Sequence, residues 1–211
     1  MPRKSKEITR IKIELVAAQL FSQRNFNDVT VDEIAAAANI TRRTLYQHFP
    51  SKLTLFASIF EKYLKNLFDD LAVVYTQEKS VKEIMKDLLT TLFNFSTEHP
   101  NFMREFWMLD ADNAGEGLPK EVMQHIHIWN RACVDLGVEF YTKHKSELGL
   151  FEKYDAEMLV HYISAINKGI FIQTEKEKAS NMETVDSNQL LQIFLDQILM
   201  SFDNTLLSKD K

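Results

Sequence analysis

Apolar residues recur every three or four positions along most of the chain, which is the spacing that gathers them on one face of an α-helix. Only 5 Gly and 4 Pro interrupt the 211 residues, few for a protein built from many strands and turns. The pattern predicts an all-α fold of about nine helices. We expect them near residues 6–24, 31–38, 42–49, 52–77, 81–98, 101–109, 119–148, 155–176 and 188–207.

The second and third of these helices carry strong end signals. Thr30 and Glu33 form the T-x-x-E pattern of a capping box, in which each side chain binds the backbone N–H of the other residue. Asn39 follows the alanine-rich helix and tolerates the left-handed backbone of a tight helix exit, and Thr41 can cap the next helix. Two short helices separated by a turn of about three residues predict a helix-turn-helix, whose second helix enters the major groove of DNA.

Charge is distributed unevenly in a way that supports this reading. The formal net charge is −5, yet up to Lys52 the chain holds nine Lys and Arg against five Asp and Glu, which favours a polyanionic partner for this region alone. Arg42 and Arg43 begin the third helix, where the helix dipole disfavours cations unless an anion is near. From there their forked side chains can reach guanine O6 and N7.

The rest of the third helix sorts by face. Leu45 and Phe49 are expected to pack inward, and Lys52 begins the next helix, where backbone N–H groups and an ammonium can hold one phosphate together. The side chains expected to face DNA are Thr44, Tyr46, Gln47 and His48, of which Gln47 can also read adenine. A short amphipathic helix with surface arginines also occurs in proteins that never bind DNA, and that alternative remains open from spacing alone.

The segment from Phe21 to Lys52 reads F-x-x-x-x-F-x-x-V-T-V-D-E-I-A-x-x-A followed by I-T-x-x-T-L-Y-x-H-F-P-S-K. It closely resembles the N-terminal DNA-binding domain of the TetR-family transcriptional regulators. The resemblance implies a homodimeric repressor that binds a palindromic DNA operator and leaves it when a small molecule enters the C-terminal domain, with no cofactor. It implies phosphate contacts for Thr30, Thr44, Tyr46, His48 and Lys52, and base contacts for Thr41, Arg42, Arg43 and Gln47.

Two positions depart from the pattern of that family. Asn39 stands where the family usually has glycine, and asparagine is the next best residue for a left-handed backbone. Arg43 stands where many members carry a small residue, which implies a different operator.

A domain boundary is expected between residues 1–52, the helix-turn-helix domain, and residues 53–211, a larger ligand-binding and dimerisation domain joined to it by a long helix. Aromatic residues concentrate in the middle helices. The candidate lining of an effector pocket is Phe68, Phe93, Phe102, Phe106, Trp107 and Trp129. Such a pocket suits a hydrophobic or aromatic molecule, such as a fatty acyl chain or a xenobiotic, but the same residues can equally form plain core. No metal site is expected, because His125 and His127 face different sides of a helix.

The last two helices, about 155–176 and 188–207, carry apolar stripes broad enough to pack on two partners each. A two-fold four-helix bundle between two subunits would satisfy both stripes and place two recognition helices about 34 to 36 Å apart. An intrachain core would satisfy them as well, and only the family resemblance favours the homodimer.

Several other classes of protein are disfavoured. No apolar run approaches the roughly 20 residues of a membrane helix, and the start lacks the apolar segment of a secretory signal, so a cytoplasmic location without membrane contact is expected. The single cysteine, Cys133, excludes an internal disulfide. An all-α enzyme is the first rival, but no Ser-His-Asp order, glycine-rich phosphate loop or H-E-x-x-H is present. A helical interaction module with no DNA role is the second, and activation in place of repression stays open.

Overall fold

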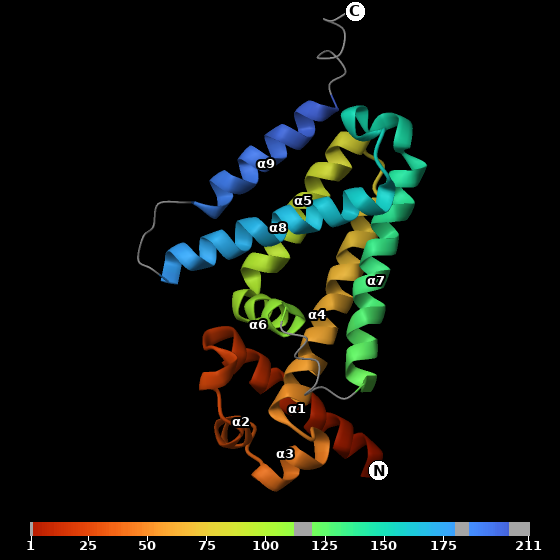
Figure 1. Ribbon diagram of the computed structural model, residues 1–211. Helices are drawn as coiled ribbons and strands as arrows, with labels where there is room; N and C mark the ends of the chain where they lie inside the picture. Colours follow the sequence, from red (N-terminus) through yellow and green to blue (C-terminus); the bar gives the residue numbers. More distant parts are fainter. Residues whose placement is uncertain (1, 112–119, 180–185, 203–211) are drawn as a thin grey trace, which may run out of the picture. The chain divides into compact units, whose positions relative to one another are not determined.

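The computed structural model describes residues 2–111, 120–179 and 186–202, and this part of the chain is helical throughout, with nine α-helices (Figure 1). The all-α prediction is therefore confirmed. The N-terminal helices are α1 (Pro2–Gln23), α2 (Val31–Ala37), α3 (Arg42–His48) and α4 (Lys52–Tyr75). The others are α5 (Val81–Glu98), α6 (Pro100–Ala111), α7 (Lys120–Lys143), α8 (Ala156–Ala179) and α9 (Ser187–Ser201).

Most helix bounds agree with the sequence pattern, and the clearest difference is at the end of α7. We expected this helix to continue to about residue 148, but it ends at Lys143 and is followed by two single-turn 3₁₀ helices, η3 (Lys145–Glu147) and η4 (Gly149–Phe151). Gly149 has a φ of 57°, and a Cβ there would lie 2.2 Å from the carbonyl oxygen of Ser201. The chain therefore leaves the helix early so that a glycine backbone can pack against the end of α9. Helix α8 continues to Ala179, three residues past its expected end, and α9 ends at Ser201, before the expected end near residue 207.

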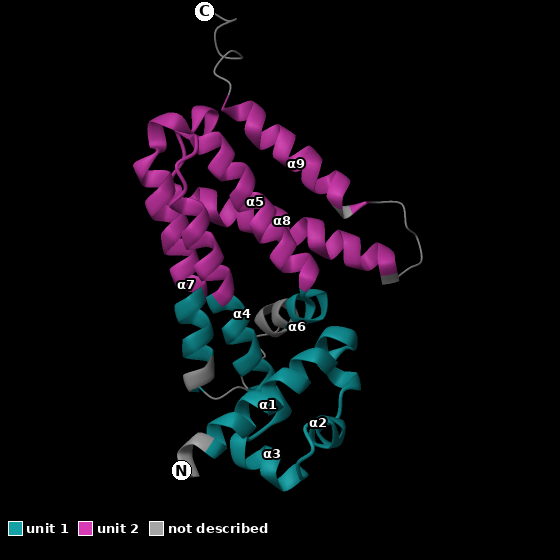
Figure 2. Cartoon of the chain, turned by 180° about the vertical axis from the view of Figure 1, so that it is seen from behind, with its two compact units in different colours: residues 1–65, 99–129 teal, residues 66–98, 130–211 magenta. Residues whose placement is uncertain are grey.

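The helices form two compact units that do not follow the order of the chain (Figure 2). Unit 1 comprises residues 1–65 and 99–129, and unit 2 comprises residues 66–98 and 130–211. Both α4 and α7 are continuous helices with residues in each unit. The functional boundary proposed between residues 52 and 53 is a separate matter and stays a prediction.

Unit 1 has an aromatic core. Phe102 of α6 is fully buried, stacks on Phe56 of α4 with ring centroids 4.7 Å apart, and meets Phe21 of α1 edge-on at 6.0 Å. Phe26 and Tyr63 add further edge contacts to Phe56 and Phe102, respectively. Aromatic pairs of this geometry stabilise a core beyond the area that they bury, so α6 helps to hold the helices that carry the helix-turn-helix.

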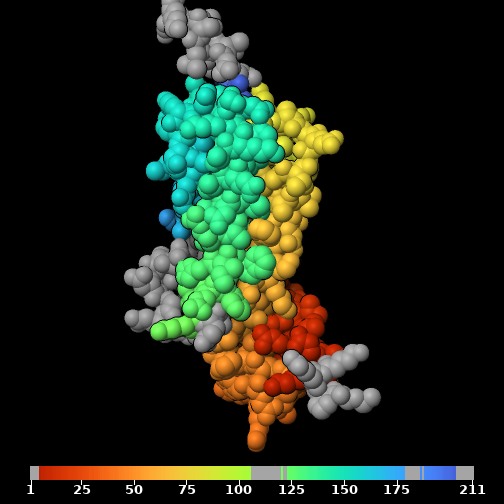
Figure 3. All heavy atoms as spheres, turned by 90° about the vertical axis from the view of Figure 1, so that its right-hand side faces the viewer, coloured from red at the N-terminus to blue at the C-terminus, as the bar shows by residue number. Residues whose placement is uncertain are grey.

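Unit 2 has a larger, mainly aliphatic core drawn from α4, α5, α7, α8 and α9. Figure 3 shows one face of this unit, where residues of α7 lie beside those of α4 and α5, and Tyr75 and Phe140 join α4 to α7 with ring centroids 4.9 Å apart. Asn167 of α8 makes polar contacts to α5, because its amide donates to the buried Ser96 hydroxyl at 3.0 Å and to the Leu92 carbonyl at 3.4 Å. Within the described residues, no helix is both long enough and apolar enough to cross a membrane.

Candidate nucleic-acid interface

Helix α2 begins and ends as the sequence predicts. The Thr30 backbone N–H donates to the Glu33 carboxylate at 2.7 Å, and the Glu33 N–H donates to the Thr30 hydroxyl at 3.2 Å, so the capping box is complete. At the other end, Asn39 has a φ of 51°. Its N–H donates to Ala36, and the N–H of Ile40 donates to the carbonyl of Ala35. This pair of bonds is a Schellman ending, and it sets the turn of the helix-turn-helix.

Helix α3 is capped by Thr41, whose hydroxyl accepts from the backbone N–H of Thr44 at 3.1 Å. Leu45 and Phe49 are fully buried, and so is Ile34 of α2. The inward face of α3 is therefore the predicted one. Because this face anchors the helix, its other face is presented to the outside.

Four of the residues predicted to face DNA are exposed on that outer face, and they are Arg42, Arg43, Tyr46 and Gln47. Thr44 and His48 are half-buried at its edges. Burial, followed by the charges of Lys6 and Arg10, lowers the pKa of His48. The side chain is therefore biased towards the neutral form when no anion is near.

Arg42 does not extend freely into solvent. Its guanidinium donates to both Asp32 oxygens of α2, at 3.1 and 3.4 Å, and to the Tyr46 hydroxyl at 3.4 Å. The guanidinium carbon also lies 5.6 Å from the centroid of the Tyr46 ring. The hydrogen bond that Arg42 donates to Tyr46, followed by the charge of Asp32, raises the pKa of Arg42. Sequence reasoning missed Asp32, because it gave a role only to Glu33 among the acidic residues of this segment.

Lys52 has a second role that the sequence did not show. Its ammonium donates to the carbonyl oxygens of Phe26 at 2.7 Å and Val29 at 2.8 Å, and it lies 4.2 Å from the centroid of the Phe26 ring. These contacts tie the 3₁₀ helix η1 (Phe26–Asp28) to the start of α4. An ammonium has three donors, so one remains for the phosphate contact that the family resemblance implies.

A buried carboxylate holds α1 against α4 behind the recognition helix. Glu14 is only 4% exposed. It accepts hydrogen bonds from Ser58 at 2.7 Å and from Lys62, and it forms an ion pair with Arg10 at 3.5 Å. Arg10 in turn covers the ring of Phe49 at 4.5 Å, directly after α3. The polar network thus connects α1, the end of α3 and α4.

Comparison with known proteins assigns this arrangement to a family. Residues 15–59 match the family model described as bacterial regulatory proteins, tetR family. The uncharacterized HTH-type transcriptional regulator YuxN of Bacillus subtilis is 32% identical over 98 residues, which are 46% of this chain and 33% of YuxN. The nucleoid occlusion factor SlmA of Haemophilus ducreyi is 29% identical over 105 residues, 49% of this chain and 52% of SlmA. The chain thus spans at most about half the length of these two relatives.

Solved structures agree in fold over most of the chain. The transcriptional regulator FadR of Bacillus subtilis, in complex with stearoyl-CoA, matches with a TM-score of 0.65 and 14% identity over 90% of this chain and 98% of FadR. A transcriptional regulator of the TetR/AcrR family from Thermobifida fusca matches with a TM-score of 0.69 and 16% identity, over 90% of this chain and 96% of that one. The match over residues 15–59 confirms the family resemblance of the N-terminal segment, and the solved structures share the fold of most of the chain. The matched proteins are transcriptional regulators, which favours a regulator over the enzyme considered as a rival.

The predicted effector-pocket residues divide between the two units. Phe102 lies in the aromatic core of unit 1, and Trp129 of the same unit has the Lys65 ammonium 5.7 Å from its ring. Phe68 and Phe93 belong to unit 2, where Phe93 is buried. The side chains of Phe106 and Trp107 lie outside the described ones. None of this tests a ligand site, and the pocket stays a prediction.

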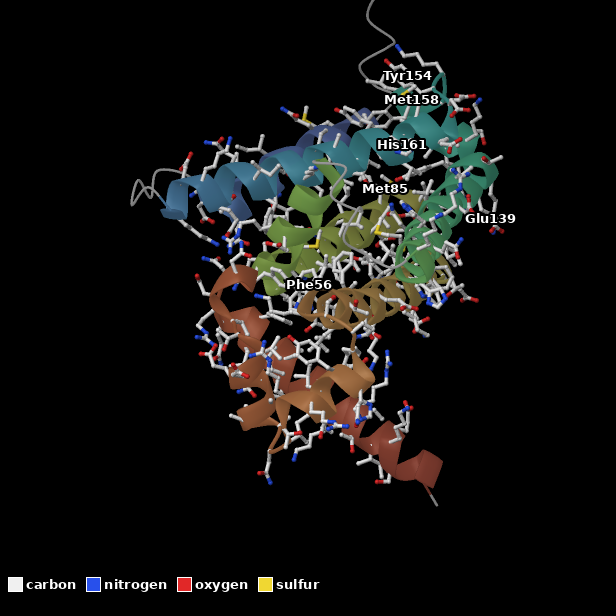
Figure 4. All side chains as sticks on the ribbon, turned by 60° about the horizontal axis from the view of Figure 1, so that its bottom comes forward. Phe56, Met85, Glu139, Tyr154, Met158 and His161 are labelled. Carbon is white, nitrogen blue, oxygen red and sulfur yellow. The ribbon has the colours of Figure 1, made fainter. Side chains whose placement is uncertain are left out.

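Unit 2 also has a surface groove at the N-terminal end of α8 that the sequence pattern did not predict. It has a volume of about 550 Å³ and is lined by Phe151, Tyr154, Met158, Leu159, His161 and Tyr162. Figure 4 shows Tyr154, Met158 and His161 together at this end of the helix. The groove was missed because Phe151 and Tyr154 lie in a segment that we expected to connect two helices.

The groove continues into an exposed stripe along α8. Met158, Tyr162, Ala165 and Gly169 are all exposed and follow one another at intervals of four, three and four residues. A Cβ built on Gly169 would meet no atom within 4 Å. Of the broad stripes expected on α8 and α9, Leu159, Ile163, Phe194, Leu195 and Ile198 are buried in the core of unit 2, whereas Met158 and Tyr162 are exposed. Ile193 and Met200 of α9, which were not part of the expected stripes, are exposed as well.

Proposed function

We propose that this protein is a ligand-responsive transcriptional repressor that acts in the cytoplasm and binds a palindromic DNA operator as a homodimer. The observation that carries the proposal is the outer face of α3, where Arg42, Arg43, Tyr46 and Gln47 are exposed on a helix fixed by its cap and its buried face. A major groove admits one such helix, and guanidinium and amide groups are the usual readers of guanine and adenine there.

Within this proposal the predicted contacts keep their two roles. Thr30, Thr44, Tyr46, His48 and Lys52 bind phosphate and set the register of the protein on DNA, whereas Thr41, Arg42, Arg43 and Gln47 face the bases. Phosphate contacts supply affinity for any sequence and make it depend on salt, while base contacts supply preference.

The test is to select bound fragments from random DNA with the purified protein at two salt concentrations. We expect a palindromic motif whose binding weakens steeply as salt rises. Tyr46→Ala is expected to weaken binding to operator and random DNA alike, and Arg42→Ala to lower affinity for the operator by about tenfold or more while relaxing one base position.

Lys86→Ala is the matched control, because it removes an exposed cation from α5, which is not part of the helix-turn-helix. Its motif and affinity are expected to equal those of the wild type. Recovery of no motif at either salt, also after denaturation and refolding to remove a bound effector, would refute DNA recognition. Equal losses on operator and random DNA for Arg42→Ala would refute its assignment to a base.

The homodimer is proposed to form through α8 and α9. One support is that apolar residues of both helices remain exposed outside the core of unit 2, with Met158 64% and Ile193 55% exposed. A second support is the pair of small exposed residues on α8, Ala165 and Gly169, which permit close approach of a second helix. The groove beside Tyr154 and Met158 would then lie at the edge of the interface.

Ile193→Glu tests the interface. Because Ile193 is exposed on α9, a charge there is expected to leave the fold intact and to convert the dimer to a monomer, as measured by sedimentation. Val73→Glu is the control, since Val73 is similarly exposed on α4 but lies off the stripe. A dimer that persists with Ile193→Glu at micromolar concentration would exclude this face.

The effector is proposed to be a small hydrophobic or aromatic molecule bound near Phe68, Phe93, Phe102, Phe106, Trp107 and Trp129. Support comes from the likeness in fold to FadR, which was solved with stearoyl-CoA. A ligand releases DNA only by binding better to the conformation with the wrong spacing of recognition helices. Helix α4 is the proposed lever, because it begins at Lys52 and continues as one helix into unit 2.

Stearoyl-CoA is the first probe for this part of the proposal. Addition to the protein–operator complex is expected to release DNA, and Phe93→Ala to raise the concentration required. Free CoA serves as the control for the head group alone. If neither stearoyl-CoA nor compounds extracted from the purified protein release DNA, a hydrophobic effector is excluded. DNA recognition is tested separately, by the selection of bound fragments.

A further inference from the structure

The contact between Asp32 and Arg42 joins the first turns of the two helices of the helix-turn-helix. Asp32 is in the first turn of α2, where a negative charge is favoured by the helix dipole, and Arg42 opens α3, where a positive charge is disfavoured. The carboxylate of Asp32, at 3.1 Å, supplies the anion that Arg42 needs when no DNA is bound. The ion pair therefore offsets the unfavourable interaction of Arg42 with the dipole of α3.

Asp32 and Tyr46 together define the direction of the guanidinium. One terminal nitrogen of Arg42 points to the two carboxylate oxygens, and the other points to the Tyr46 hydroxyl. Arginine is a planar fork with five N–H donors, so fixing two of its nitrogens orients the remaining donors as well. A free arginine would instead sample many rotamers and could take any phosphate oxygen within reach.

The carboxylate also has an electrostatic effect on DNA binding. Asp32 and Arg42 are 68% and 58% exposed, so both charges act on a polyanion that approaches this face. An exposed ion pair of this kind contributes little to stability, and the negative member opposes phosphate. Its presence beside the recognition helix therefore lowers affinity for all DNA, unless the arginine that it holds makes a specific contact.

We propose that Asp32 is a positioning residue for operator recognition, which holds Arg42 in the orientation that reads one base and keeps it from binding phosphate nonspecifically. The inference rests on the proposed function and deepens it, because it names the residue that turns a cation at the start of α3 into a reader of sequence. Asp32 raises the ratio of operator to nonspecific affinity, although it lowers affinity for DNA in general.

The test is to select DNA with four proteins and to measure affinity for the selected operator and for a scrambled duplex. The proteins are the wild type, Asp32→Asn, Arg42→Ala and the double variant. Asp28→Asn is the matched control, because it also removes one exposed carboxylate of unit 1. Asp28 accepts from Asn25 and acts electrostatically on Lys52, which is assigned to phosphate and not to a base. Thermal unfolding of each variant checks that α2 is still formed.

Asp32→Asn is expected to bind scrambled DNA about threefold more tightly, because an opposing charge is gone. At one base position it is expected to lose about tenfold of preference, the scale of one bidentate base contact. In the Arg42→Ala background, Asp32→Asn is expected to leave base preference unchanged, since Asp32 acts through Arg42. Asp28→Asn is expected to keep the wild-type motif.

Two outcomes would overturn the inference while leaving the proposed function intact. In the first, Asp32→Asn changes operator and scrambled affinity by the same factor and keeps the motif. In the second, it alters base preference equally with and without Arg42. A wild-type protein that selects no DNA sequence would instead refute the proposed function, and the inference with it.

Discussion

Unit 1 and unit 2 are both helical, but the contacts that determine them differ in range and in kind. In unit 1, a capping box, a Schellman turn and a threonine cap define short helices within a few residues of chain. Polar contacts of Glu14 and Lys52 join α1 and the segment around η1 to α4. In unit 2, the helices are longer and one large apolar core holds them. Local signals therefore describe the first unit well, whereas packing decides the second.

The largest expected effect on stability comes from removing one ring from the aromatic core of unit 1. Phe102→Ala is expected to lower the free energy of unfolding by about 3–5 kcal/mol, because a fully buried ring that touches Phe21 and Phe56 leaves a cavity. Chemical denaturation measures it. Retention of wild-type stability, together with weaker effector binding, would instead show that Phe102 lines an open pocket.

In unit 2, the corresponding test of core packing adds volume instead of removing it. Gly137→Ala in α7 is expected to cost about 2 kcal/mol, because the new Cβ would lie 2.8 Å from Val160 in α8. Gly169→Ala in α8 is the control, since nothing lies within 4 Å, and it is expected to stabilise the monomer by up to about 1 kcal/mol. Both substitutions are measured in the monomeric Ile193→Glu background, because Gly169 lies on the stripe proposed to form the dimer. Equal effects of the two substitutions on the unfolding midpoint would contradict the packing described for unit 2.

A smaller effect is expected from the polar network of unit 1. Glu14→Ala is expected to lower stability by about 1–2 kcal/mol, because Ser58 and Arg10 lose a buried acceptor, although Lys62 is half exposed and can turn to water. Lys62→Ala should cost less, since Glu14 keeps its other partners. If the two variants unfold at the same denaturant concentration, the network does not depend on the carboxylate.

The capping box of α2 predicts an effect in acid. Hydrogen bonds from Arg24 and Thr30 lower the pKa of Glu33 from 4.5 to about 2. A lowered carboxyl pKa stabilises the fold above the unfolded value, and this contribution is lost as pH falls from about 4.5 through about 2. Glu33→Gln should therefore be less stable than the wild type at neutral pH and equal to it below about pH 2. A difference that is constant with pH would show that the charge of Glu33 is unimportant.

The smallest expected effect concerns His48. Burial, Lys6 and Arg10 lower its pKa in the free protein, with Glu7 opposing them, whereas a phosphate at this side chain would raise the pKa. Binding would then take up a proton, so operator affinity should rise modestly as pH falls from about 8 to about 6. His48→Gln should flatten that dependence in a pH series of binding measurements. Identical slopes for the two proteins would remove His48 from the phosphate contacts.

Local chemistry made the helix-turn-helix readable from the sequence. Each of its end signals acts within about five residues, so neighbouring residues suffice to predict it. These signals are the cap at Thr30, the left-handed backbone of Asn39 and the cap at Thr41. The buried side of α3 follows from spacing for the same reason. The predicted end of α7 was wrong because the actual end depends on Gly149, which contacts a segment about fifty residues further along the chain.

By itself, the sequence determined the all-α class, most helix bounds, the family resemblance of the N-terminal segment and the residues that α3 exposes. Only the tertiary structure decided which partners these residues have: Asp32 for Arg42, the carbonyls of Phe26 and Val29 for Lys52, and the rings of Phe21 and Phe56 for Phe102. The physical reason is range. Caps and helical faces are set by neighbours in the chain, whereas partners separated by ten to eighty residues depend on how the helices pack.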